Sequence, residues 1–269
     1  MSFNFTAHPV LLNLGSFTIY SWGLLNAIAI LVACFFIYKK AKKHFPEKEI
    51  EGLALSAIIS AIIFARVAYI LINPKEFTSF IDYISIWKGG LEGFGTFIGG
   101  ILGAYIFSKI KKIDFWAFMD TSAPWLALAY GIGRIGCFLR GCCFGLPTDL
   151  PWGVIYSEGS LAASQFTSAV HPTQLYHALA DFIIFFLLLW LIKRKQKKVF
   201  KINETHGKIF LLFLILYSIE RFLIDFLRWH SQNELFALGF SIEQFVYFIM
   251  FIVSLLLILK KARKRENFI

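Results

Sequence analysis

Charged residues are scarce in this chain. They make up 16% of its 269 residues, whereas 58% are hydrophobic and 18% are aromatic. Soluble globular domains carry about 25% charged residues, so the composition excludes an ordinary water-soluble protein. The sequence also lacks internal repeats, low-complexity segments and any boundary of a soluble domain. We therefore expect residues 1–269 to form one membrane domain.

The N-terminal segment lacks the features of a removable signal peptide. Residues 1–17 contain no basic residue and no small-residue cleavage site, both of which such peptides carry. We therefore expect the first apolar segment to insert into the membrane and to remain there.

Cysteine is also scarce, with four residues in the chain. Cys34 lies in an apolar segment, and Cys137, Cys142 and Cys143 stand close together in the sequence on the expected outer side, after the fourth apolar segment. No histidine or second cysteine pair stands at metal-ligand spacing. The sequence therefore favours small packing residues, or an oxidisable pair on the outer side, over a zinc site, and it predicts no metal and no cofactor.

Seven apolar segments are long enough to cross a bilayer, for which a helix needs about 20 residues. They cover residues 18–38, 52–73, 90–108, 115–136, 174–192, 209–228 and 240–259. The third and fourth are the weakest, because glycines dilute one and Asp120 interrupts the other. The sequence predicts an all-α membrane bundle of seven transmembrane helices.

The basic residues indicate the orientation of these helices. Lysine and arginine clusters follow the first, third, fifth and seventh spans and hold 20 of the 27 basic residues. Because such clusters favour cytoplasmic loops, we expect the N-terminus outside and the C-terminus in the cytoplasm. The net charge of +10 then reflects topology and attraction to anionic membrane lipids, and it indicates no nucleic-acid partner.

A long outer loop separates the fourth and fifth spans. Residues 141–170 include Pro147, Pro151 and Gly153, which mark turns, and few basic residues. We expect this periplasmic segment to carry function or to cover a site, as loops of this length usually do.

Arg134 stands in a glycine-rich run, residues 131–145 (GIGRIGCFLRGCCFG), at the end of an apolar span. A guanidinium keeps its charge at physiological pH, so near lipid it requires an anion, a carboxylate or water. Glycines let the backbone approach a ligand closely. The run therefore indicates a site for an anionic group at membrane depth.

Three further arginines fall within predicted spans. Arg66 lies in the second span, and Arg221 and Arg228 share one helix face of the sixth span with Asp225. One interpretation is an ion-paired latch between helices, in which Asp225 neutralises Arg221 or Arg228. The other is a phosphate site, because planar guanidinium groups match phosphate oxygens. The excess of arginines over acids favours the phosphate site.

Residues 171–176 (HPTQLY) open the fifth span from the outside. Thr173 is suited to cap the helix and Tyr176 to join the interfacial aromatic belt. The helix N-terminus would alternatively direct its backbone N–H groups toward an anion. Both interpretations remain open.

Four segments of the chain resemble the prolipoprotein diacylglyceryl transferases, which are bacterial inner-membrane enzymes. They are residues 133–138 (GRIGCF) followed by Gly141 and Gly145, residues 151–154 (PWGV), residues 171–176, and residues 221–228 (RFLIDFLR). Gly23, Arg66 and the pair Gly89 and Gly90 also fit the pattern. The resemblance therefore spans nearly the whole multi-pass chain.

The resemblance implies a transferase of lipoprotein biosynthesis. Such enzymes move the diacylglyceryl group of phosphatidylglycerol to the lipobox cysteine of a prolipoprotein, whose signal peptide docks in the membrane, and release glycerol phosphate. Negative charge then builds on the departing oxygen, where preorganised guanidinium groups stabilise it.

The same resemblance assigns roles to individual residues. We expect Arg134, Arg221 and Asp225 to be catalytic. We expect phosphatidylglycerol to be bound by Arg134, Arg66, Arg228, Gly133, Gly136, Cys137, Gly145, His171, Gln174, Tyr176, Tyr20, Trp22, Glu92 and Phe94.

The chain departs from the family pattern at the proton-transfer part of the site. Phe94 stands where many members carry His or Tyr, and a phenyl ring can neither accept nor donate a proton. Trp22 replaces a common Tyr, Cys137 and Arg140 occupy the usual Asn positions, and Asp225 is shorter than the common Glu. Glu92, Asp225, His171 or water remain as proton acceptors.

Two rival classes of function stay open. An anion or lipid transporter would use the arginines as a pathway, with openings on both membrane faces. A catalytically silent relative would bind lipid or lipoprotein precursors without turnover, and Phe94 is the feature that favours it.

Overall fold

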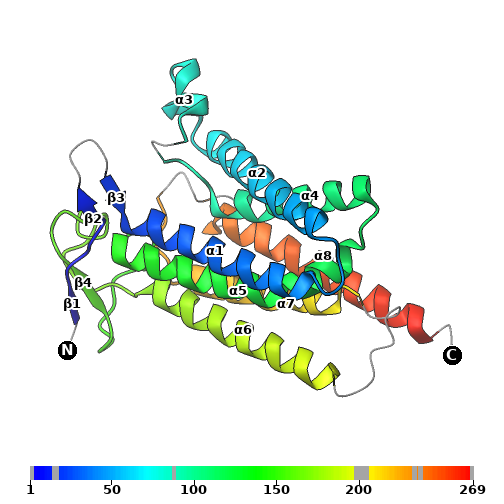
Figure 1. Cartoon of the computed structure of the whole chain (residues 1–269). Coiled ribbons are helices and arrows are strands. Elements are labelled where there is room, and N and C mark those ends of the chain that lie inside the picture. The colour runs from blue at the N-terminus through cyan, green and yellow to red at the C-terminus, as the bar shows by residue number, and fades with distance from the viewer. Residues whose placement is uncertain are drawn as a thin grey trace. The chain divides into compact units, whose positions relative to one another are not determined.

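The computed structural model describes residues 3–13, 18–86, 89–196, 206–231, 235 and 239–266. The fold is helical, with only short strands (Figure 1). The long helices are α1 (Ser21–Ala41), α2 (Glu47–Ile72), α4 (Gly93–Lys111), α5 (Phe115–Arg140), α6 (Thr173–Gln196), α7 (Lys208–Asp225) and α8 (Ile242–Glu266). The short elements are β1 (Phe3–Phe5), β2 (Val10–Asn13), β3 (Thr18–Tyr20), η1 (Pro74–Glu76), α3 (Phe80–Ile84) and β4 (Val154–Tyr156).

Each of the seven predicted apolar segments corresponds to one long helix. Two boundaries differ by more than four residues: α2 begins at Glu47 rather than at residue 52, and α8 continues to Glu266 rather than ending at 259. In both cases charged residues extend the helix beyond its apolar part, because Lys, Glu and Arg are good helix formers.

Within the residues that the structure describes, five helices are long and apolar enough to cross a membrane, namely α1, α2, α4, α6 and α8. The prediction of a helical membrane protein is therefore confirmed. The count of seven spans and their orientation stay predictions, since α5 and α7 are not among the five.

The chain divides into two compact units. The first contains Met1–Phe36, Ser122–Trp229 and Tyr247–Ile269, and the second contains Ile37–Thr121 and His230–Val246. The single membrane domain expected from the sequence stays a prediction.

Aromatic side chains join the helices of the first unit. Phe36 of α1 stacks on Trp125 of α5 with ring centroids 4.4 Å apart. Tyr130 of α5 meets Tyr217 of α7 at 5.0 Å. Such pairs contribute packing beyond their buried area, and they bring α1 and α7 against α5.

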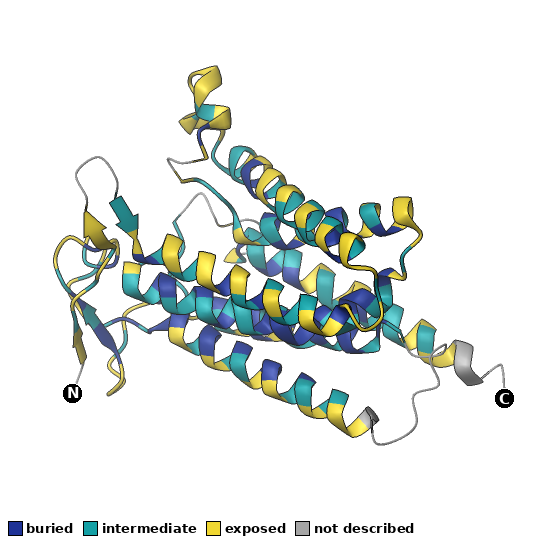
Figure 2. Cartoon of the chain, viewed as in Figure 1, coloured by how far each residue is buried: buried dark blue, intermediate teal, exposed yellow. Residues whose placement is uncertain are grey.

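The exposed side of α6 is apolar. Leu179, Ile183, Phe186 and Trp190 are each exposed over 47% or more of their surface. Their spacing of three or four residues places them on one helix face, and Figure 2 shows exposed and buried residues alternating along this helix. An apolar stripe of this length is the surface that lipid covers in a membrane protein.

The segment between α5 and α6 is ordered by strands and an aromatic core. β1 pairs in parallel with β4, so that Phe3 lies opposite Val154 and Phe5 opposite Tyr156. Phe144, Tyr156 and Val170 form the centre of a buried cluster in this segment. The predicted outer loop is therefore a packed structure built on the end of α5.

Glycines join α2 and α4 in the second unit. A Cβ atom added at Gly95, Gly99 or Gly103 would lie 2.5–2.6 Å from a backbone oxygen of α2. The spacing of four residues places these glycines on one face, as in close helix pairs within membranes. The face of α4 that carries these glycines is therefore packed against α2.

Candidate functional site

Arg134 lies six residues before the end of α5, beside glycines that contact α1. A Cβ atom at Gly136 would lie 3.3 Å from the Cα atom of Trp22, and one at Gly133 would lie 3.0 Å from the Oδ1 atom of Asn26. These glycines therefore allow helix packing. Their expected contact with lipid stays a prediction.

Arg134 is a cation without a carboxylate partner. Its side chain is partly buried, and it forms no ion pair with an acidic group in the part of the chain that the structure describes. The guanidinium groups of Arg221 and Arg228 act on it electrostatically and repel it. Three cations of the first unit therefore gather near the end of α5, and an anion would relieve their repulsion.

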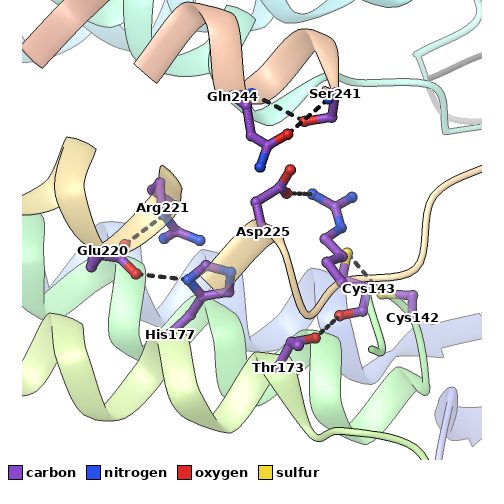
Figure 3. A network of polar contacts seen from close by, with 10 residues as sticks. Cys142, Cys143, Thr173, His177, Glu220, Arg221, Asp225, Ser241 and Gln244 are labelled. Carbon is purple, nitrogen blue, oxygen red and sulfur yellow. Dashed lines mark hydrogen bonds and ion pairs between the residues drawn. The ribbon is translucent and has the colours of Figure 1, made fainter. Parts of the chain in front are cut away.

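Arg221, by contrast, sits in a buried network of acids (Figure 3). Its Nε atom lies 2.8 Å from the Oε1 atom of Glu220, and its Nη2 atom lies 3.2 Å from the Oδ2 atom of Asp181. The second carboxylate oxygen of Glu220 lies 2.7 Å from the Nδ1 atom of His177. Arg221 is therefore held in place by acids from two helices.

One donor of Arg221 remains available. Its Nη1 atom is buried and has no hydrogen-bond partner among the described residues. Because an unsatisfied buried donor is costly, this atom is suited to donate to a bound anion. Arg221 thus combines a fixed position with one open hydrogen bond.

Sequence reasoning missed Asp181 and His177 as partners of this network. They lie on α6, 40 or more residues from Arg221 and Glu220 in the chain. A signal was present, since an aspartate in the middle of an apolar helix is rare without a partner.

Asp225 and Arg228 pair with each other at the end of α7. The Nη1 atom of Arg228 lies 3.7 Å from the Oδ1 atom of Asp225. The helix ends at Asp225, so Arg228 folds back from the following turn instead of continuing the face that carries Arg221. Asp225 thus pairs with Arg228 within one segment of the chain, whereas the ion pair of Arg221 across helices is with Asp181.

Arg66 is occupied by backbone carbonyl groups within the second unit. Its Nη1 atom donates to the carbonyl oxygens of Gly89 and Gly90 at 2.7 and 2.9 Å. Its Nε and Nη2 atoms donate to those of Tyr83 and Asp82. Arg66 is buried, and it holds together the backbone of residues 82–85 and 89–90. Its role in lipid binding stays a prediction.

Three cysteine sulfurs come together after α5. The Sγ atoms of Cys137, Cys142 and Cys143 all lie within 4.8 Å of one another. Gly141 and Cys143 adopt left-handed backbone conformations, with φ of +72° and +57°. This turn brings neighbouring cysteines to one place, an arrangement that the sequence spacing did not indicate.

The start of α6 fixes this cysteine turn. The hydroxyl of Thr173 donates to the carbonyl oxygen of Cys143 at 2.7 Å, and the amide of Gln174 donates to that of Cys142 at 2.6 Å. Both side chains are fully buried. Gln174, expected to bind lipid, therefore holds the backbone of the turn, and Thr173 uses its hydroxyl in the same way.

The surroundings of the turn lower the pKa of Cys143. Hydrogen bonding with the sulfurs of Cys137 and Cys142 lowers the pKa of Cys143 most, and the cations Arg228 and Arg134 lower it further. The pKa of Cys142 is raised, because hydrogen bonding with the other two sulfurs favours its thiol form.

Gly145 is required where the turn meets two other segments. A Cβ atom at this position would lie 2.5 Å from the carbonyl oxygen of Leu227 and 2.6 Å from the Cβ atom of His171. The N–H of Gly145 donates to the carbonyl oxygen of His171 at 2.9 Å. Gly145 thus joins the cysteine turn, the start of α6 and the chain after α7.

An open pocket of about 700 Å³ lies beside Pro172 and Tyr176 at the start of α6. Phe138, Trp152, Leu175 and Tyr176 are among its mostly apolar lining residues. The Tyr176 hydroxyl accepts a hydrogen bond from Trp152 at 2.8 Å and lies 3.2 Å from the Nδ1 atom of His171. Burial lowers the pKa of His171.

The other predicted lipid-binding residues lie in both units. In the first unit, Tyr20 ends β3 and is exposed, and the ring of Trp22 lies 5.9 Å from the guanidinium carbon of Arg140. In the second unit, Glu92 precedes α4 and Phe94 lies in its first turn, both partly buried. Their binding roles stay predictions.

Comparisons with known proteins point to one family. A family model described as prolipoprotein diacylglyceryl transferase matches residues 9–260. A protein of Clostridium tetani named phosphatidylglycerol–prolipoprotein diacylglyceryl transferase is 34% identical over 248 residues, which cover 92% of this chain and 95% of the relative. Proteins with the same name from Thermosynechococcus vestitus and Geobacter sulfurreducens are 33% and 29% identical, over 82% and 96% of this chain and 81% and 96% of their own.

Proposed function

The chain belongs to the prolipoprotein diacylglyceryl transferase family, and on that premise we propose that it moves the diacylglyceryl group of phosphatidylglycerol to a cysteine thiol of a prolipoprotein. Glycerol phosphate is the second product. The acceptor is the lipobox cysteine, presented by a signal peptide that docks from the bilayer.

The observation that carries this proposal is the state of Arg134. Arg66 and Arg228 bind protein groups, and Arg221 is neutralised by Glu220 and Asp181. Arg134 has no such acid, and the repulsion from its two cationic neighbours favours an anion beside it. The phosphate of the lipid donor supplies that anion.

The reaction breaks the bond between a glyceryl carbon and a phosphate oxygen. Negative charge builds on that oxygen as the bond breaks, and fixed donors stabilise it without reorganising. Arg134 provides a bidentate guanidinium, and the free Nη1 donor of Arg221 provides a further hydrogen bond. Asp225 acts indirectly by holding Arg228.

The apolar pocket suits an acyl chain of the donor. Phe138 follows Arg134 by four residues and therefore lies on the same face of α5. It lines the pocket together with Leu175. Filling the pocket with the variant Leu175→Trp should slow transfer from a long-chain donor more than transfer from a short-chain donor. Equal slowing with both donors would remove the pocket from this role.

The topology expected from the sequence completes the proposal. All seven long helices cross the bacterial inner membrane, with the C-terminus in the cytoplasm. The segment between α5 and α6 then lies on the periplasmic side, where exported prolipoproteins present their cysteine. Support comes from the basic clusters at or just after the C-terminal ends of α1, α4, α6 and α8.

An assay with purified components tests the function. The protein is placed in lipid nanodiscs that contain phosphatidylglycerol labelled in its acyl chains, and a lipobox peptide is added. Mass spectrometry should detect the peptide with a diacylglyceryl thioether, and glycerol phosphate should appear in equal amount. A peptide with Ser in place of Cys is the control. If the peptide binds but neither product forms, the chain is a silent relative rather than a transferase.

A further inference from the structure

The three sulfurs at the end of α5 have the separation of a metal-thiolate site. The Sγ atoms of Cys142 and Cys143 are 4.0 Å apart, and that of Cys137 lies within 4.8 Å of both. Zinc–sulfur bonds of about 2.3 Å place three sulfurs about 3.8 Å apart in a tetrahedral site and about 4.0 Å apart in a planar one. The Sγ atom of Cys137 therefore needs to move by at most about 1 Å to reach the sulfur spacing of a zinc site.

We propose that Cys137, Cys142 and Cys143 bind one Zn²⁺ ion through three thiolates and leave its fourth position open. Thiolate sulfur is the ligand that Zn²⁺ and other soft cations prefer. A site with three protein ligands and one exchangeable position is typical of catalytic rather than structural zinc.

The surrounding structure holds these ligands in place. The hydroxyl of Thr173 donates to the carbonyl oxygen of Cys143 (Figure 3). The amide of Gln174 donates to that of Cys142, and both Thr173 and Gln174 are fully buried. Outer hydrogen bonds of this kind orient metal ligands and are part of a functioning site.

The local charge also suits the ion. Three thiolates and one Zn²⁺ carry a net charge of about −1, by simple addition of the charges that such ligands bear. Arg228 and Arg134 both act electrostatically on Cys143 and balance that charge. The site therefore needs no further acid or base.

The open fourth position of the zinc ion suggests a role for the site in the transfer reaction, and this role rests on the proposed function. The acceptor cysteine must become a thiolate before it can attack carbon, and Phe94 supplies no proton acceptor at the position where the family commonly has one. Zinc deprotonates a thiol that coordinates it. The acceptor thiol is therefore the group that we assign to the fourth position.

The step balances without another reactant. The acceptor sulfur binds Zn²⁺ and its proton passes to water. An electron pair of this sulfur then forms the new bond to the glyceryl carbon. The bond from that carbon to the phosphate oxygen breaks, and its electron pair leaves with glycerol phosphate. The thioether product is a weaker zinc ligand than the thiolate and dissociates.

Metal binding itself is the first test, and it needs no activity. The full chain is purified under reducing conditions, stripped with a chelator and titrated with Zn²⁺ or Co²⁺. We expect about one ion per chain and, with Co²⁺, the intense near-ultraviolet absorption of sulfur-to-cobalt charge transfer. Cys142→Ser and Cys143→Ser should each lose this absorption, and the matched control Cys34→Ser on α1 should keep it.

The fourth position is tested by adding the lipobox peptide to the Co²⁺ form. The Cys peptide should increase the charge-transfer absorption, because a fourth sulfur joins the metal, whereas the Ser peptide should leave it unchanged. Transfer by the metal-free protein should be at least tenfold slower than transfer by the Zn²⁺ form.

These readings separate the two proposals. Metal binding and the peptide response without lipid transfer would reject the proposed function and keep the zinc site. Full transfer by the metal-free protein would reject the role of the fourth position. Absence of bound metal under reducing conditions, or a Cys142–Cys143 disulfide in the freshly isolated protein, would reject the site itself.

Discussion

Arg221 on α7 reaches across to Asp181 on α6, with Nη2 and Oδ2 3.2 Å apart and both side chains at most 1% exposed. Two charges buried this deeply are favourable only when each has a well-placed partner. Glu220 and Asp181 together position the guanidinium of Arg221 while leaving one donor open. The pair therefore both connects two helices and prepares the site.

Removing the carboxylate of Asp181 should destabilise the protein. Breaking a buried ion pair costs about 3–5 kcal/mol of unfolding free energy. The loss in Asp181→Asn should lie at the lower end of this range, because Glu220 still pairs with Arg221. The thermal unfolding midpoint of the protein in detergent measures the effect. Asp149→Asn, at an exposed position, is the matched control. Equal midpoints for wild type and Asp181→Asn would show that the pair adds no stability.

Arg134 should be essential for transfer but not for folding. Loss of one preorganised donor at a developing oxyanion costs about 10²–10³ in rate, so Arg134→Ala should lose at least that factor. Arg134→Lys should keep the charge and lose bidentate binding. Its rate should lie between those of the wild type and Arg134→Ala. The initial rate of thioether formation measures both variants.

The control for Arg134 is Arg194→Gln. Arg194 lies near the other end of α6, with its guanidinium 4.0 Å from the ring centroid of Trp190, and it should be dispensable. Wild-type turnover by Arg134→Ala would exclude this residue from the mechanism.

The sequence identified the helices and the arginines, because long apolar runs and charges within them are local signals. It did not identify their partners. Asp181 meets Arg221 across 40 residues of chain, and the carbonyl groups around Arg66 come from a segment 16 or more residues away. Such contacts depend on how helices pack, which periodicity does not encode.

The cysteine cluster was missed for a different reason. Its formation depends on a left-handed backbone at Cys143, with φ of +57°, and few residues other than glycine adopt this conformation. From their spacing in the sequence alone, the side chains of adjacent residues such as Cys142 and Cys143 are expected to point in different directions. The bonds from Thr173 and Gln174 hold the turn in the less common conformation.

The packing of α4 on α2 should be sensitive to a single methyl group. A Cβ atom at Gly99 would lie 2.5 Å from the carbonyl oxygen of Ser60, so Gly99→Ala forces the helices apart. Overpacking of this kind costs about 1–3 kcal/mol and should lower the thermal unfolding midpoint. Gly93→Ala adds its methyl group where no atom lies within 4 Å and should leave the midpoint unchanged. Equal midpoints for the two variants would show that α2 and α4 do not pack through Gly99.

The last prediction concerns the stability of the protein between pH 7.5 and 5.5. Burial lowers the pKa of His171 below its usual value of 6.5, so the unfolded chain binds a proton there more readily than the folded chain. Stability then rises with pH wherever the unfolded state holds more protons, and His171 contributes fully above pH 6.5 and loses its contribution as the pH falls below it. Replacing it in His171→Gln should therefore flatten the decline of the unfolding midpoint on acidification. The other histidines are unchanged between the two proteins, so a decline of the same slope in both would mean that His171 titrates alike in the folded and unfolded states.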